Sequence, residues 1–235
     1  MFDLLIQNAQ VLDGTGAPGF TADVAVKDGK IAAVGKIDGE AAETVDAAGL
    51  TLAPGFIDVH GHSDFFMPLD PARASKLLQG VTTELCGQCG LGPAPVTEQN
   101  YPVYHKYLSQ QGIPMYPDDR TFTSFSAYLS RMERTPAGIN LAYFIPHGTV
   151  RLAVMGFSHE APDETQLAQM RELVEDAMQA GALGLSTGLA YAPGRFAATD
   201  ELAALTEPVG RYGGVYTSHL RDQGDQLEQS VQETI

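Results

Sequence analysis

The sequence predicts an α/β protein in which part of a small β-sandwich precedes a parallel sheet that alternates with helices. Two observations carry this prediction. Residues 1–51 contain short apolar runs without helical periodicity, which is typical of β-strands. From residue 52 to residue 235, apolar runs of strand length alternate with segments whose apolar residues recur at helical spacing. We therefore expect one domain over residues 1–51 and a second over residues 52–235.

Short strands account for the first domain. Apolar residues gather at 4–7, alternate along 22–27 and return at 31–34. Asp28-Gly29, between the last two runs, is the signature of a tight type I′ hairpin turn. Because these few short strands cannot close a sandwich, we expect this domain to be partial.

Five apolar runs in the second domain have the length of buried strands. They cover residues 52–60, 81–85, 139–145, 182–187 and 215–218. Strands separated by helices pair in parallel, and functional residues then gather at their carboxyl ends. A doubly wound sheet shares this pattern, but its dinucleotide fingerprint is absent, because Gly181, Gly184 and Gly188 follow a helix and do not open one.

Helices are predicted between these strands from caps and apolar stripes. One begins with Asp70 as its N-cap, and others follow the apolar residues of 122–132 and 167–177. The helix that begins at Thr199 contains Pro208, which we expect to kink it or end it early.

Two segments depart from this alternation. Residues 97–121 are polar and aromatic, and they form either an insertion over the end of the sheet or a plain surface excursion. Residues 225–235 begin another helix that stops without a cap or a following strand. Five strands do not complete an eight-stranded barrel, so we expect the chain to be a piece of a longer protein.

Composition and charge exclude several classes of protein. The chain has 235 residues, of which 44% are hydrophobic and 18% charged, so it is neither disordered nor fibrous. Its net charge of −15 disfavours binding to nucleic acid and to anionic membranes. We see no secretory signal or membrane span, and two cysteines cannot build a disulfide framework. A cytoplasmic protein is expected, with its oligomeric state open.

Residues 54–64 carry the clearest chemical signal. In a strand, residues two apart point to the same side, so His60 and His62 should project together. Two neutral imidazoles that converge at a strand end suit zinc. The alternative is a surface pair beside a turn. The buried strand favours a metal site, as do Asp58 and Asp64, which could be hydrogen-bond partners of the imidazoles.

The pair Cys86 and Cys89 follows the second strand and allows three interpretations. It could be a redox motif, half of a zinc knuckle, or a lone thiolate ligand from Cys89 in the loop. The second ligand pair that a knuckle needs is absent from the sequence, and the segment after Cys89 reads as a loop where the redox motif needs a helix. Cys86 is expected to be a small buried hydrophobe.

Other candidates lie at or after strand ends. His219 ends the fifth strand and is either structural or a further metal ligand on the same face. Tyr191 lies in the loop after the fourth strand, where it either packs or binds substrate. His147 is a weaker candidate, and we expect His105 and His159 to be solvated.

The sequence resembles the amino-terminal half of the N-acyl-D-amino-acid deacylases (D-aminoacylases) of the amidohydrolase superfamily. The resemblance rests on five stretches: PGFIDVHGHSD at 54–64, GVTT at 80–83, QCG at 88–90, GLSTGLAYAPG at 184–194 and YTSHLRD at 216–222. The Cys-Gly element is the most specific, because these enzymes use a cysteine ligand where their relatives use a carboxylated lysine.

The resemblance implies a partial (β/α)8 TIM-like barrel of the metal-dependent hydrolases. It implies zinc-dependent hydrolysis of N-acyl-D-amino acids to a carboxylate and a D-amino acid. His60 and His62 would hold a weaker or second metal, Cys89 would be a thiolate ligand able to bridge, and His219 would hold the tightly bound zinc. Tyr191 would help to hold the substrate carboxylate.

Two alternatives stay open. A cyclic amidohydrolase, such as a dihydroorotase- or hydantoinase-like enzyme, would use a lysine in place of Cys89. A non-catalytic zinc-binding fragment is the second, because the resemblance implies that the general-base aspartate lies beyond Ile235, and residues 1–235 alone should then be inactive. The preferred D-side chain and the number of zinc ions are not fixed by the sequence.

Overall fold

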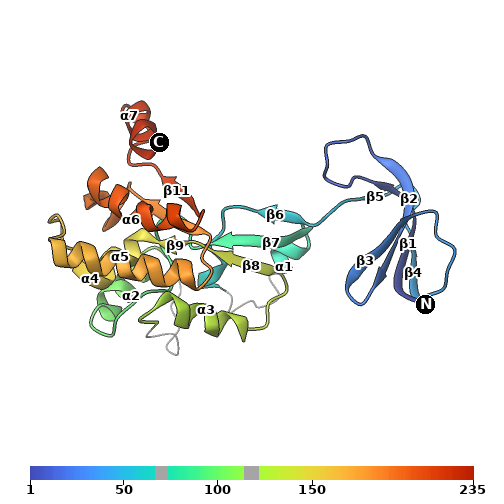
Figure 1. Ribbon diagram of the computed structural model, residues 1–235, viewed down its shortest axis with the longest axis horizontal. Coiled ribbons are helices and arrows are strands. Elements are labelled where there is room, and N and C mark those ends of the chain that lie inside the picture. The colour runs from blue at the N-terminus through green and yellow to red at the C-terminus, as the bar shows by residue number, and fades with distance from the viewer. Residues whose placement is uncertain (67–73, 114–121) are drawn as a thin grey trace. The chain divides into compact units, whose positions relative to one another are not determined.

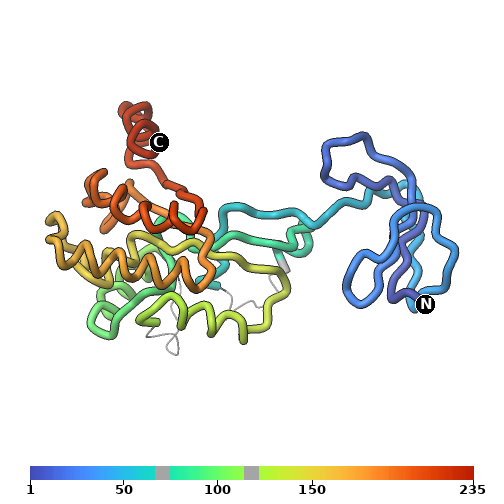
Figure 2. The backbone as a smooth tube through the Cα atoms, viewed as in Figure 1, coloured from blue at the N-terminus to red at the C-terminus, as the bar shows by residue number. Residues whose placement is uncertain are grey.

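The computed structural model describes residues 1–66, 74–113 and 122–235 (Figures 1 and 2). The expected helix cap Asp70 lies outside the described residues. The chain divides into two compact units, Met1–Gly55 and Phe56–Ile235, each with its own contacts. Among the described residues, none of the helices has the length and apolar character needed to cross a bilayer.

The first unit is one five-stranded sheet. Its strands are β1 (Phe2–Val11), β2 (Phe20–Lys27), β3 (Lys30–Gly35), β4 (Ala41–Asp46) and β5 (Thr51–Leu52). The strand order is β3-β2-β1-β4, with β5 also on β1; β1 to β3 are antiparallel, and β4 and β5 run parallel to β1. Asp28 and Gly29 both have positive φ, 52° and 70°, which confirms the type I′ turn. Strand β4 was not expected, because its residues are mostly exposed and give no apolar alternation.

The second unit contains two three-stranded sheets whose neighbouring strands are all parallel, as predicted. One has the order β6 (Phe56–Asp58), β7 (Val81–Cys86), β8 (Asn140–Tyr143), and the other β11 (Val215–His219), β10 (Gly184–Gly188), β9 (Ile145–Pro146). The strand expected over 139–145 is therefore divided at Phe144, whose N–H donates to the carbonyl of Cys86.

The strand expected over residues 52–60 is also interrupted. Thr51 and Leu52 pair with β1 in the first unit, and only residues 56–58 pair with β7. Pro54, which lacks an N–H, and Gly55 separate the two pieces, since neither favours a continuous ladder.

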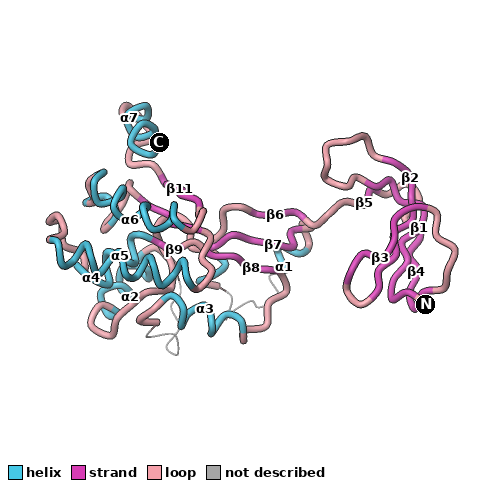
Figure 3. The backbone as a smooth tube through the Cα atoms, viewed as in Figure 1, coloured by secondary structure: helices cyan, strands magenta, loops and turns pink. Residues whose placement is uncertain are grey.

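Helices lie along the second unit (Figure 3). They are α1 (Ala74–Leu77), α2 (Tyr101–Gln110), α3 (Phe125–Glu133), α4 (His147–Met155), α5 (Glu164–Gln179), α6 (Thr199–Arg211) and α7 (Leu227–Thr234), with 3₁₀ turns η1 (Ser63–Phe65) and η3 (Gly194–Phe196). Helix α5 has a complete capping box between Asp163 and Gln166. The expected early end at Pro208 is wrong: α6 continues to Arg211, because proline removes only one hydrogen bond and its buried ring lies beside the buried Val209.

Two apolar clusters hold these layers together. The larger joins residues of α3 to α6 to those of β8, β9 and β10: Phe125, Tyr128, Tyr143, Ile145, Val150, Met170, Val174, Leu185, Leu205 and Val209. In the second cluster, Tyr104 and Leu108 of α2 pack with Phe65 and Leu91. The described part of 97–121 is thus packed into the unit and is no plain surface excursion.

Candidate metal centre

Three of the described residues converge on one point at the carboxyl ends of β6 and β7. His60, His62 and Cys89 each bring one ligand atom within 4.8 Å of the other two. Nε2 of His60 lies 3.1 Å from Sγ of Cys89, and the two imidazole centroids are 5.6 Å apart. Ligand atoms around one tetrahedral zinc are about 3.3–3.8 Å apart, from bond lengths of roughly 2.0–2.3 Å. The two imidazoles and the thiol are therefore ligands of the kind that zinc prefers, and they lie close enough together to be gathered on one ion by small side-chain movements.

The histidine pair follows β6 and stays attached to the neighbouring strand. The N–H of Gly61 donates to the carbonyl of Leu85 over 3.0 Å, so the segment still runs beside β7. Asp58 accepts from the N–H of His60 at 3.1 Å and pairs with Lys76. Asp58 thus fixes the backbone before the pair, and its hydrogen bonds go to that backbone and to Lys76.

Burial changes the proton affinity of this group. It lowers the pKa of His62, and the neighbouring His60 lowers it further. It raises the pKa of the Cys89 thiol, against a hydrogen bond with Tyr191 that lowers it. A neutral His62 keeps its lone pair for a metal, while Cys89 must release a proton when it binds one.

The loop that carries Cys89 is fixed by backbone contacts. Cys89 has φ = 58°, an uncommon conformation for a residue with a side chain. A Cβ added to Gly90 would lie 2.6 Å from the N of Gly188, so only glycine lets the loop lie against the end of β10. The N–H of Gly90 also donates to Oγ of Ser186 at 3.1 Å. Strand β10 therefore supports the thiol.

Asp64 supports the same loop through a hydrogen bond to its backbone. It is buried, and it accepts from the N–H of Gly87 at 3.1 Å. Burial raises its pKa to about 7, against the hydrogen bonds from the N–H groups of Gly87 and Phe65. Asp64 was expected as a partner of the imidazoles, but the hydrogen bonds of the described residues direct it to the cysteine loop.

Tyr191 and His219 lie next to the three-residue group without joining it. The Tyr191 hydroxyl donates to the carbonyl of Cys89 over 2.5 Å, and its ring packs edge-on against His219 with centroids 5.2 Å apart. The N–H of Leu189 bonds the carbonyl of His219 at 2.9 Å. The structure thus places Tyr191 against Cys89 and His219 against Tyr191, and the roles of both residues in metal and substrate binding stay predictions.

Gln88 is a connection that the sequence did not reveal. Its side chain is buried, donates to the carbonyl of Val59 at 3.0 Å and accepts from Oγ1 of Thr217 at 3.0 Å. One amide therefore joins the segment after β6 to strand β11. The sequence offered no signal for this role, because both partners are distant along the chain.

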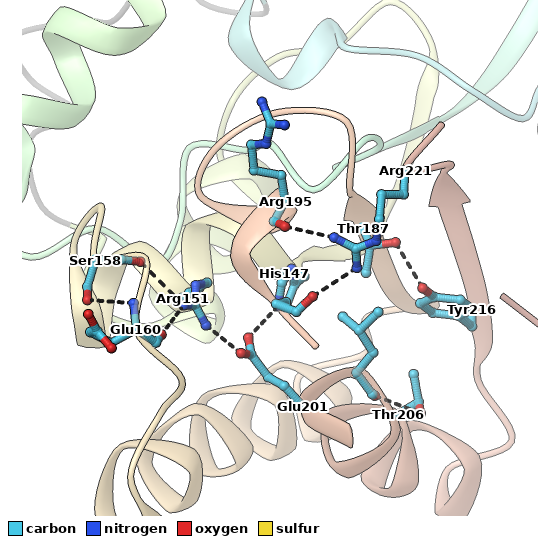
Figure 4. A network of polar contacts seen from close by, with 12 residues as sticks. His147, Arg151, Ser158, Glu160, Thr187, Arg195, Glu201, Thr206, Tyr216 and Arg221 are labelled. Atoms are coloured by element: carbon cyan, nitrogen blue, oxygen red, sulfur yellow. Dashed lines mark hydrogen bonds and ion pairs between the residues drawn. The ribbon is translucent and has the colours of Figure 1, made fainter. Parts of the chain in front are cut away.

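The remaining candidates lie elsewhere. His147 is fully buried, and its Nε2 lies 2.9 Å from Glu201, which also pairs with Arg151 (Figure 4). His105 and His159 are exposed, as expected. Cys86 is fully buried with a raised thiol pKa, which confirms it as a small buried hydrophobe.

Comparison with known proteins adds to this geometry. The sequence profile described as "Amidohydrolase family" matches residues 43–217. The chain is 38% identical to D-aminoacylase and 37% identical to N-acyl-D-aspartate deacylase of Alcaligenes xylosoxydans xylosoxydans, over 100% and 99% of its own length and 47% and 46% of theirs. It also superposes on N-acyl-D-glutamate deacylase of Bordetella bronchiseptica, solved with zinc and a phosphonate inhibitor. That match has a TM-score of 0.89 and 35% identity, over 99% of this chain and 48% of the other. The chain spans about half the length of the curated relatives it matches.

Proposed function

This chain belongs to the amidohydrolase family, and from that premise we propose that the protein is a zinc-dependent hydrolase that cleaves N-acyl-D-amino acids into a carboxylate and a D-amino acid. The observation that carries the proposal is the convergence of His60, His62 and Cys89 at the carboxyl ends of adjacent parallel strands. Relatives named for this activity, 37–38% identical to the chain, support it.

The proposal includes the fold around the site. We assign the parallel strands β6 to β11 to a (β/α)8 TIM-like barrel and the first unit to part of a β-sandwich domain. The parallel pairing of both sheets and the position of the ligands after β6 and β7 support this assignment, because barrel enzymes carry their sites at strand carboxyl ends. We place the protein in the cytoplasm, where Cys86 and Cys89 would stay reduced.

The residues of the site have distinct tasks in this reaction. Zinc bound at this centre would supply Lewis acidity, which polarises the acyl carbonyl and makes water nucleophilic at neutral pH. The thiolate of Cys89 favours zinc over magnesium, because a soft sulfur donor suits the softer ion. We assign His219, together with Cys89, to the tightly bound zinc and His60 and His62 to a weaker or second metal position. We assign Tyr191 to the substrate carboxylate. The hydrogen bond from Tyr191 to Cys89 and the ring contact between Tyr191 and His219 support these assignments.

Removal of the thiol tests the metal site. We expect Cys89→Ala to lose at least about ten-fold in zinc affinity, since a ligand matters no less than its outer partners, whose loss costs 10–100-fold. Zinc content is measured by atomic absorption after dialysis against a weak chelator. Cys86→Ala is the matched control, because that buried thiol lies outside the ligand group. A Cys89→Ala protein with wild-type zinc and activity contradicts the assignment.

A substrate panel tests the reaction. N-acetyl-D-methionine, its L-isomer and a hydantoin are assayed with the zinc-loaded full-length protein, and we expect kcat/KM to be highest for the D-isomer. The hydantoin represents the cyclic amidohydrolase alternative, in which the scissile amide is part of a ring. Preference for the hydantoin would reject the deacylase proposal, and equal rates for the two isomers would reject its stereochemistry.

A further inference from the structure

The turn that carries the two histidines is built over a buried carboxylate. Glu84 lies on β7, and its side chain has no exposed surface. A Cβ added to Gly61 would lie 1.7 Å from Oε1 of Glu84, so this carboxylate fills the space below the glycine between His60 and His62. Residue 61 can therefore only be glycine while Glu84 occupies that position.

The same carboxylate holds the residue that follows the pair. The N–H of Ser63 lies 3.2 Å from Oε1 of Glu84, and the Ser63 hydroxyl donates to Oε2 over 2.5 Å. Ser63 is itself buried, so both bonds are protected from water. The ammonium of Lys76, 3.7 Å from Oε2, balances the buried negative charge.

These contacts hold the backbone of the turn against β7 and leave the side chains of His60 and His62 to project from it. The backbone of Gly61 is fixed on Leu85, and Ser63 is fixed on Glu84. The segment from 60 to 62 is thus anchored on the side of β7, the strand that leads into the Cys89 loop. A buried carboxylate is costly in an apolar interior, and a leucine would fill the same volume without that cost. Among the described residues, Glu84 accepts two hydrogen bonds from Ser63, next to the candidate ligands.

We propose that Glu84 is a positioning residue of the metal centre, which acts through Ser63 to hold His60 and His62 in the orientation that faces Cys89. This inference rests on the proposed zinc function. Among the described residues, Glu84 makes no hydrogen bond or ion pair with a candidate ligand atom. It fixes the position of the turn, and the position of the turn determines how well the three ligands meet at one ion.

Two substitutions separate the role from general stability. Glu84→Gln keeps the volume but replaces one acceptor oxygen with a donor, so it cannot accept both bonds from Ser63. Ser63→Ala removes only the hydroxyl bond and is the milder change. Loss of a partner outside the ligand shell lowers metal affinity by roughly 10–100-fold, and we expect both variants to fall in that range.

The control variants remove equivalent groups away from the site. Ser230→Ala deletes a buried serine on α7 whose hydroxyl accepts from the N–H of Asp222. Glu201→Gln neutralises the buried carboxylate between His147 and Arg151 (Figure 4). Both should lower the unfolding temperature without changing zinc affinity.

The experiment measures the zinc dissociation constant of each folded protein by competition with a chromogenic chelator. Cobalt(II) is then substituted, and its thiolate charge-transfer band reports the geometry at Cys89. We expect weaker zinc binding and a shifted cobalt spectrum for Glu84→Gln and for Ser63→Ala, but not for the two control variants. In the double variant Glu84→Gln/Ser63→Ala, the fold-loss of zinc affinity should be smaller than the product of the two single fold-losses. If Glu84→Gln does not fold, Ser63→Ala against Ser230→Ala decides.

The outcomes distinguish this inference from the function on which it rests. A wild-type protein that does not bind zinc through Cys89 would overturn both. Wild-type zinc binding with unchanged affinity and spectrum in Ser63→Ala and Glu84→Gln would overturn only the role of Glu84. Equal losses in the two control variants would show that any buried deletion loosens the centre, and would also reject it.

Discussion

Cys89 combines an unusual backbone conformation with a proposed role as a metal ligand. Its φ of 58° lies in the left-handed region, which costs a residue with a side chain about 1–3 kcal/mol. The hydrogen bonds from Tyr191 to its carbonyl and from Gly90 to Ser186 offset that cost. The thiol therefore reaches the histidines because its neighbours stabilise an otherwise unfavourable backbone.

Gly90 gives a direct test of this support. Gly90→Ala would place a Cβ 2.6 Å from the backbone N of Gly188, which cannot move without disturbing β10. We expect a loss of at least about 3 kcal/mol in the free energy of unfolding, from strain and overpacking together. Zinc affinity should fall as well. Urea unfolding followed by circular dichroism measures the first effect.

Gly112→Ala is the control that isolates the cost of placing alanine at a positive φ. Gly112 has φ = 72°, close to the 66° of Gly90, and a Cβ added there meets nothing within 4 Å. We expect a loss of about 1 kcal/mol and unchanged zinc binding. Equal losses for the two variants would show that the contact with Gly188 contributes nothing.

At the scale of elements, one buried network joins two helices. Nε2 of His147 lies at the start of α4, 2.9 Å from Oε1 of Glu201 in the first turn of α6. Arg151, one turn further along α4, binds the same carboxylate and donates to the carbonyls of Ser158 and Glu160 at 3.3 and 2.7 Å (Figure 4). The network thus fixes α4 to α6 and to the loop that leads into α5.

This network predicts a pH dependence. Burial opposes the ionisation of Glu201, but the hydrogen bond with His147 and the charges of His147 and Arg151 outweigh it and lower the pKa of Glu201. A lowered folded pKa means that the carboxylate contributes stability above its unfolded value, near about 4.3, and loses it as the pH falls through the folded value. Glu201→Gln should therefore show less acid destabilisation than the wild type below about pH 4.3.

At neutral pH the same variant should be less stable. Glu201→Gln leaves Arg151 without its buried counter-charge, and breaking such a pair costs about 3 kcal/mol. Urea midpoints from pH 3 to pH 7 measure both effects. Glu175→Gln, which neutralises the half-exposed partner of Arg211, is the control and should lose much less. A pH profile for Glu201→Gln parallel to the wild type would reject the ionised pair.

Elements with a clear apolar period were predictable, and the others were not. Strands β7, β10 and β11 and helices α3 and α5 follow patterns visible in the sequence. Helix α4 was missed because six of its nine residues are buried, so it carries no polar face, and it begins directly after β9. Strand β4 was missed for the opposite reason, since most of it is exposed.

The candidate site divides in the same way. His60, His62 and Cys89 could be found because their residue types and their places after strands point to a metal. Glu84 and Gln88 could not, because their partners become neighbours only when β7 pairs with β6 and the two sheets approach each other. A buried carboxylate and a buried amide look like ordinary polar residues until their partners are known.

At the scale of the whole molecule, the ligands lie in one unit. His60, His62 and Cys89 all belong to Phe56–Ile235, while the first unit has a separate apolar cluster around Ala9 and Val24. A metal bound by these three residues would link the segment after β6 to the loop after β7. Its binding energy would therefore stabilise the second unit.

Zinc should raise the thermal stability of that unit. At free zinc of 100 times the dissociation constant, linkage adds about 2.7 kcal/mol to the free energy of unfolding. Scanning calorimetry in the presence of zinc and in the presence of EDTA measures the difference in unfolding temperature. The double variant His60→Ala/His62→Ala should show a smaller shift between the two conditions than the wild type. An equal response from that variant would place the zinc elsewhere in the protein.

The distance along the chain between His60 and Cys89 also fixes when the metal can be captured. The two residues are 29 positions apart and meet only because β6 and β7 are parallel, a pairing that a tight turn cannot make. The chain must first close a long loop, and that closure precedes any gain from the ligands. Zinc uptake at this centre therefore follows the assembly of the sheet and cannot nucleate it. This is the reverse of a zinc finger, which is unfolded until its metal binds. During folding of this protein, a thiolate-to-cobalt absorption band would thus mark the moment at which β6 and β7 have paired.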